Sequence, residues 1–257
     1  MLLIPQHVLF KWMAAMFWPF LRLTGVFLTA PVLGSATIPR LHRVLMSALF
    51  ALCLAAWDGP WPAMPVSWIG ILYAGIVQVA FGAGIGFVGQ VIVSTAGGAG
   101  EIAGAAIGSN YATTVGLSSS PAPPVLFNIL YWAGLMVYIG LGGMFWTISA
   151  VARSFHTSPG GIPEAGSWLA LAQYAGVILE SGTLLALPAL AAAFALNLAT
   201  GLANALAPAL NIFSVGFPVL LLGGIWVIGS SIFFVEPTVI HLMLRGGRLI
   251  SHWIGNS

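Results

Sequence analysis

The sequence predicts an all-α, polytopic membrane-type protein with about six long, kinked hydrophobic helices. The first observation is composition, because 60% of the 257 residues are hydrophobic and only 5% are charged, against about 25% charged in soluble domains. The second is length, because six apolar segments each lie near or above the ~20 residues that a helical bilayer crossing needs. These segments are residues 10–30, 41–57, 67–95, 125–151, 168–204 and 213–235. The third is that no repeat or linker divides the chain, so residues 1–257 are expected to form one domain.

Composition also argues against several classes of function. The net charge of +2 comes from 7 basic and 5 acidic residues, which does not provide the basic surface of a nucleic-acid-binding protein. The single cysteine, Cys53, cannot form an intrachain disulfide. The five histidines show no metal-binding spacing such as HExxH, and no serine lies in a GxSxG turn. We therefore expect neither an enzyme nor a cofactor.

The first two apolar segments carry most of the N-terminal basic residues. Arg22 lies inside the first segment, where an arginine costs about 2.5–3.5 kcal/mol on insertion scales unless it pairs or snorkels. Its side chain should therefore face protein or water. Arg40, His42 and Arg43 open the second segment and indicate a headgroup-level or cytoplasmic end. If all six segments cross the membrane, four Lys and Arg residues lie on the side of the two termini and two lie on the other side. Because basic residues are enriched on the cytoplasmic side, this count favours both termini in the cytoplasm.

The third segment ends in small residues at every fourth position, Ala96, Gly100, Gly104 and Gly108. On a helix this spacing forms one flat face where another backbone can approach closely. The partner helix is either in another subunit or in this chain. If the helix continues to about residue 108, it exceeds the ~30 Å hydrocarbon core at ~1.5 Å per residue, so it must tilt, kink or protrude.

Residues 109–124 differ in composition from the apolar segments on either side. Residues 109–114 carry no charge and, apart from Ala112, no strong helix former, so the helix should end there. A glycine, three serines and three prolines follow, and their backbone groups must meet water or protein. Non-helical backbone in so apolar a chain predicts the lining of a cavity. An ordinary loop between two helices is the alternative.

The fourth and fifth segments are long enough to bend. The fourth is expected to bend near Gly142 and Gly143, and the fifth at Pro188. Two carboxylates, Glu101 and Glu180, lie within apolar runs. We expect at least one buried ion pair among Arg22, Glu101 and Glu180, because an ionisable group at depth needs a partner. The alternative is that each of them snorkels or meets water.

The C-terminal part of the sequence contains amide side chains and small residues at helical spacing. Asn197 and Gly201 are spaced by four and share a helix face where helices can hydrogen-bond. Pro208 is expected to break the helix, and Asn211 and 216–218 mark further irregular backbone. The residues predicted to serve helix packing are Gly100, Gly104, Gly108, Asn197, Gly201, Pro208, Asn211, Gly216 and Pro218.

Five pieces of sequence, in this order, resemble the FliR family of flagellar type III protein export. They are WPFLR at 18–22, Ala30-Pro31, GEIAGAAIGSNYATT at 100–114, NLATGL at 197–202 and PALNIFSVGFP at 208–218. The resemblance covers about residues 12–235. The Gly-Phe-Pro at 216–218 is closer to flagellar members than to the virulence branch. The chain departs from the family pattern at Ala209, at Gly142-Gly143-Met144 and at Thr114, which puts polar contacts at those sites in question.

The resemblance implies a single-copy subunit of the export gate, with no cofactor, in the bacterial inner membrane at the flagellar basal body. Its implied partners are FliP-like and FliQ-like subunits, with FlhB-like and FlhA-like export components, and unfolded flagellar proteins would pass through the shared pore. The helices would pack as helical hairpins. In this interpretation the central loop lies across the pore as a plug. The plug residues would be Ser109, Asn110, Tyr111, Thr113, Thr114, Val115 and Leu117.

Two other functions remain open at this point. A virulence type III secretion subunit of the same family would share these features. A secondary transporter or small-solute channel also has broken helices and deep carboxylates, but the chain lacks the inverted repeat typical of that class.

Overall fold

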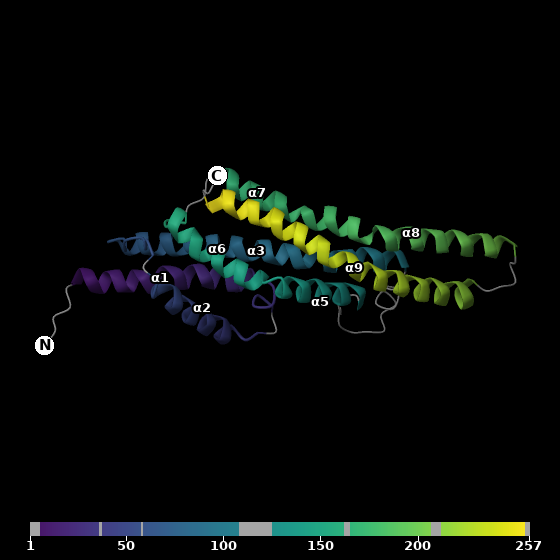
Figure 1. The fold of residues 1–257 in the computed structure, drawn as a ribbon, viewed down its shortest axis with the longest axis horizontal. Coiled ribbons are helices and arrows are strands. Elements are labelled where there is room, and N and C mark those ends of the chain that lie inside the picture. Colours follow the sequence, from purple (N-terminus) through teal and green to yellow (C-terminus); the bar gives the residue numbers. More distant parts are fainter. Residues whose placement is uncertain are drawn as a thin grey trace. The chain divides into compact units, whose positions relative to one another are not determined.

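The computed structural model describes residues 6–35, 38–57, 59–107, 125–161, 165–206 and 212–254. Over these ranges the regular elements are all α-helices, which confirms the predicted fold class (Figure 1). They are α1 (Gln6–Thr29), α2 (Arg40–Ala55), α3 (Trp68–Ile107), α5 (Val125–Gly140), α6 (Gly143–Thr157), α7 (Ala165–Ala175), α8 (Val177–Leu206) and α9 (Ile212–Ile254).

Three of the described helices are long and apolar enough to cross a membrane: Phe10–Thr29, Trp68–Ile107 and Gly166–Ala199. A fourth span is possible if α5 and α6 are taken as one broken crossing. The predicted extension of the third segment through the glycine stripe is confirmed, because α3 runs for 40 residues. At ~1.5 Å per residue it measures about 60 Å, twice the thickness of the hydrocarbon core.

The fourth segment is interrupted close to Gly142 and Gly143, as predicted. The helix is interrupted at Leu141 and Gly142, and Gly142 adopts φ 75°. An L side chain rarely adopts this left-handed conformation, so the turn favours glycine.

One other backbone prediction was wrong, and one break was not predicted. The fifth segment is interrupted at Gly176, between α7 and α8, and the bend expected at Pro188, which lies inside α8, stays a prediction. Gly216 and Pro218 lie inside α9, which is helical from Ile212 to Ile254. A proline removes one backbone hydrogen bond, but ending the helix in apolar surroundings would leave more groups unsatisfied, so the helix continues through it.

The chain divides into two compact units. Unit 1 comprises Met1–Gln90, Gly142–Tyr174 and Met243–Ser257, and unit 2 comprises Val91–Leu141 and Ala175–Leu242. The expectation of one export-gate domain over residues 1–257 stays a prediction.

Unit 1 is held by a close contact between α1 and α3. A Cβ added to Gly82 would lie 1.8 Å from the carbonyl oxygen of Arg22, and one added to Gly25 would lie 2.0 Å from that of Val79. The two backbones therefore touch where neither helix carries a side chain. Thr29 reinforces the contact by donating a hydrogen bond of 2.7 Å to the carbonyl oxygen of Ala83.

Unit 2 uses the second half of α3 in the same way. A Cβ on Gly100 would lie 2.3 Å from the carbonyl oxygen of Leu126 on α5, and one on Gly134 would lie 2.6 Å from Cβ of Ala96. The α3 and α5 segments therefore form a tight helical hairpin. Helix α3 ends at Ile107 and α5 begins at Val125, and the residues between them lie outside the described ranges.

Candidate functional site

The most developed polar site of the described structure surrounds Arg22 in unit 1. The side chain is fully buried. Its Nε donates a hydrogen bond of 2.7 Å to Oε1 of Gln78 on α3, and its Nη1 donates one of 2.6 Å to Oγ of Ser154 on α6. Its Nη2 donates to the carbonyl oxygens of Ser158 and Pro159, at 3.2 and 3.3 Å. One guanidinium thus joins α1, α3, α6 and the turn after α6.

Aromatic rings complete the surroundings of this cation. The Cζ atom of Arg22 lies 3.8 Å from the ring centroid of Phe155 and 4.6 Å from that of Phe81. Rings attract a cation through their negative faces, most strongly when water is excluded. Gln78 is oriented in turn, because its Nε2 donates a hydrogen bond of 2.9 Å to the carbonyl oxygen of Pro159. The site therefore stabilises a buried charge with neutral groups only.

This arrangement corrects the predicted ion pair in part. Arg22 is buried as expected, but the groups that hold it are an amide, a hydroxyl and two carbonyls. Glu101 and Glu180 are exposed in the described chain, so they do not form the predicted set of buried charges. Neutral oxygens satisfy a guanidinium with less desolvation cost than a buried carboxylate would incur.

Gln78 and Ser154 are not among the site residues predicted from the sequence. Both side chains are buried, but each lies in a helix that carries other polar residues, so the sequence does not single them out. Their distances from Arg22 along the chain are 56 and 132 residues, so no local pattern connects them with it.

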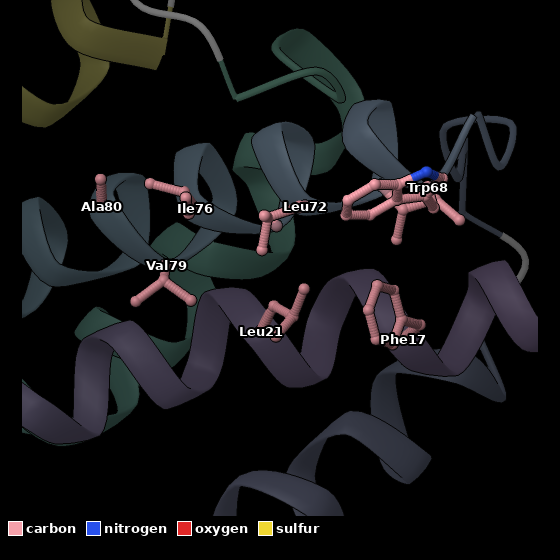
Figure 2. Close-up of a pocket in the computed structure, with 9 residues that line it drawn as sticks. Phe17, Leu21, Trp68, Leu72, Ile76, Val79 and Ala80 are labelled. Carbon is pink, nitrogen blue, oxygen red and sulfur yellow. The ribbon is translucent and has the colours of Figure 1, made fainter. Parts of the chain in front are cut away.

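A second feature of unit 1 is an apolar pocket of about 560 Å³ between α1 and α3. Figure 2 shows Phe17 and Leu21 of α1 facing Leu72 and Val79 of α3 across it. Its lining is entirely apolar: Phe17, Leu21, Trp68, Ile71, Leu72, Gly75, Ile76, Val79 and Ala80. Such a lining offers no group for acid, base or nucleophilic chemistry, but it suits an apolar chain or helix.

Within the described ranges, no three His, Cys, Asp or Glu side chains come together as they would around a metal ion.

The predicted plug lies outside the described residues. This applies to Ser109, Asn110, Tyr111, Thr113, Thr114, Val115 and Leu117, and also to Gly108, Pro208 and Asn211. The structure does describe the two helices on either side of that segment, which contact each other closely at Gly100 of α3 and Leu126 of α5.

The remaining predicted packing residues differ from one another. Gly100 contacts α5 of the same chain, so the glycine stripe is used within the chain at that point, and Gly104 is also buried. Asn197 is exposed. A Cβ on Gly201 would meet nothing within 4 Å, so Gly201 makes no close helix contact among the described residues.

Long apolar helices joined by close glycine contacts and a buried arginine define an all-α membrane protein. Comparison with known proteins identifies its family. The model for bacterial export proteins, family 1, matches residues 13–246, and the chain therefore belongs to that family.

Its curated relatives are flagellar biosynthetic proteins. The chain is 32% identical to the flagellar biosynthetic protein FliR of Escherichia coli strain K12, over 94% of this chain and 93% of the relative. It is 31% identical to the FliR of Pectobacterium carotovorum, over 90% and 89% of the two chains. It is 21% identical to the FliR of Bacillus subtilis strain 168, over 77% and 78%. The resemblance inferred from five short pieces of sequence is thus confirmed.

Proposed function

We propose that this protein is a subunit of the flagellar protein export apparatus. The observation that carries the proposal is the family match over residues 13–246, together with relatives named as flagellar biosynthetic proteins that align over most of both chains. These relatives favour the flagellar system over the virulence branch and over a small-solute transporter.

The subunit works in the bacterial inner membrane as a multi-pass protein, beside FliP-like and FliQ-like partners and with FlhB-like and FlhA-like components. Support for a multi-subunit assembly comes from the apolar side chains that the isolated chain leaves exposed. On α8 these include Leu184, Leu187, Phe194, Leu198 and Leu202. A helix face of this kind is covered by lipid or by other membrane helices. The exposed Asn197 and Gly201 lie on this helix and would allow a partner helix to approach closely and hydrogen-bond.

Residues 109–124 restrict the pore through which unfolded flagellar proteins pass. This part of the proposal is supported by the hairpin of α3 and α5, the two helices on either side of the segment. The uncharged serine, threonine and asparagine side chains suit backbone that faces water. Weak, varied contacts let a polypeptide pass without being trapped.

Deleting the gene should abolish secretion of hook and filament subunits while leaving small-solute uptake intact. An export subunit has no substitute within the apparatus, whereas a transporter would change the uptake of its solute. Immunoblots of culture medium and cells measure the first effect, and uptake of labelled solutes measures the second. Restoring the gene is the control. Normal secretion from the deletion strain would refute the proposed function.

Purification in mild detergent should yield a fixed complex rather than the chain alone. Mass measurement of the intact complex is expected to show one copy of this protein with several copies of small FliP-like and FliQ-like subunits, which are the partners proposed above. Recovery of the isolated chain from cells that export normally would contradict the proposed partners.

A further inference from the structure

The connection between α1 and α2 in unit 1 contains a strained turn. Val32 adopts φ 69°, and among the described residues it is the one residue other than glycine with a positive φ. The backbone N–H of Leu33 donates a hydrogen bond of 2.9 Å to the carbonyl oxygen of Pro31. A three-residue turn with a positive φ at its centre is the rare, strained form of γ-turn, and a β-branched residue is especially unfavourable there. The surrounding structure must therefore impose this conformation.

The side of the turn toward α1 is firmly held. Thr29, the last residue of α1, donates a hydrogen bond of 2.7 Å to the carbonyl oxygen of Ala83 on α3. The next residue, Ala30, is buried, and its N–H donates to the carbonyl oxygen of Val26 at 2.7 Å. The N–H of Gly34 donates to the carbonyl oxygen of Ala30 at 2.8 Å. Relaxation of the turn would therefore move α2 rather than α1.

Helix α2 is attached near its start by Arg43 and beyond its end by Trp57. Nη2 of Arg43 donates hydrogen bonds to the carbonyl oxygens of Ser35 and Ile38, at 3.1 Å in the second case. Nε of Arg43 is buried and has no hydrogen-bond partner in the described structure, which is costly for a charged group. The rings of Trp57 and His156 lie 5.5 Å apart between centroids, and both side chains are exposed. Each attachment is therefore imperfectly satisfied or open to solvent.

The packing of α2 is also sparse. Of its 16 residues, the buried ones are Ser47 and Ala51, and both are small. In α1, by contrast, the buried side chains include Trp18 and Phe27. A segment with few buried apolar contacts opens at a lower free energy than the core to which it is attached.

We propose that α2 is a hinged helix that opens away from α1 about the turn at Val32, with Arg43 as the latch that holds it closed. Opening lets Val32 return to a relaxed φ and exposes Nε of Arg43 to water. Both changes favour the open state, whereas the two hydrogen bonds of Arg43 favour the closed one. Helix α2 therefore opens while the rest of unit 1 stays folded. This inference does not depend on the export function.

Thiol labelling of the full-length protein in detergent measures this opening. Cys53, the single cysteine of the sequence, is exposed and is first replaced by serine. Ser47→Cys then places a thiol on the buried side of α2, and Thr147→Cys places one at a buried position of α6 in the same unit. Because only α2 opens locally, Ser47→Cys should react with N-ethylmaleimide at least about tenfold faster than Thr147→Cys. Equal rates at the two positions would overturn the proposal.

Two further substitutions, each combined with Ser47→Cys, test the latch and the strain. Arg43→Gln should speed labelling by about tenfold or more, because the bonds from the charged group are lost. Val32→Gly should slow it by about threefold or more, because glycine adopts a positive φ without steric cost. Arg40→Gln is the matched control, since Arg40 is an exposed arginine at the start of the same helix. Faster labelling with Val32→Gly, or equal effects of Arg43→Gln and Arg40→Gln, would overturn the proposal.

Discussion

Arg22→Met should lower the thermal unfolding midpoint of the detergent-solubilised protein by about 6 °C or more. The substitution removes four hydrogen bonds from a fully buried guanidinium, and each bond to a charged group contributes about 1.5–3 kcal/mol. Losing the equivalent of two such bonds costs at least about 3 kcal/mol, and each kcal/mol shifts the midpoint by about 2–4 °C in a protein of this size. Oε1 of Gln78 would also lose its donor inside an apolar core.

Two further variants separate the geometry of this site from its charge. Arg22→Lys keeps the charge but replaces a planar fork with three clustered donors, which cannot reach acceptors on α3, on α6 and in the following turn together. We expect a midpoint between those of Arg22→Met and the native protein. Arg153→Met is the matched control, because Arg153 is an exposed arginine of the same unit. Equal midpoints for Arg22→Met and Arg153→Met would show that the cluster does not stabilise the fold.

Gly100→Ala should destabilise the hairpin of α3 and α5, whereas Gly201→Ala should be neutral or stabilising. The new Cβ at residue 100 would lie 2.3 Å from the carbonyl oxygen and 2.7 Å from the carbonyl carbon of Leu126. These are backbone atoms that cannot rotate away, so the helices must separate, at a typical cost of about 1–3 kcal/mol. At Gly201 the Cβ would meet nothing within 4 Å, and alanine is favoured over glycine in helices by about 1 kcal/mol.

Unfolding midpoints and export assays together measure the effect of these two variants. Helices α3 and α5 lie on either side of residues 109–124, so Gly100→Ala is also expected to reduce secretion of hook and filament subunits. Gly98→Ala provides a control on the same helix, since its Cβ would meet only a side-chain carbon of Ile178 at 3.5 Å. A Gly100→Ala protein as stable as Gly98→Ala would contradict the close contact.

Helix type and extent could be predicted because they depend on local composition. The length of α3 follows from an apolar stretch without proline, and the break at Gly142 follows from neighbouring glycines. Pro218 misled the prediction, because it lies inside α9. A proline costs one hydrogen bond, whereas ending a helix in apolar surroundings costs more.

The partners of Arg22 could not be predicted in the same way. Its burial followed from the cost of an arginine within an apolar helix, but the choice between carboxylate and neutral partners depends on contacts across more than 50 residues. Gln78 and Ser154 supply those contacts. For Glu101, apolar neighbours in sequence do not decide which side of the helix faces outward, and the structure of the chain leaves it exposed.

The central claim is that residues 109–124 obstruct a conduit for polypeptides, and ion conductance through the assembled complex tests it most directly. The purified complex is placed in planar bilayers, with the native protein and a variant shortened within 110–120 measured side by side. Equal unfolding midpoints of the two complexes provide the control for folding. The account predicts a low leak for the native complex and a clearly raised conductance for the shortened one. Equal conductance of two well-folded complexes would contradict it.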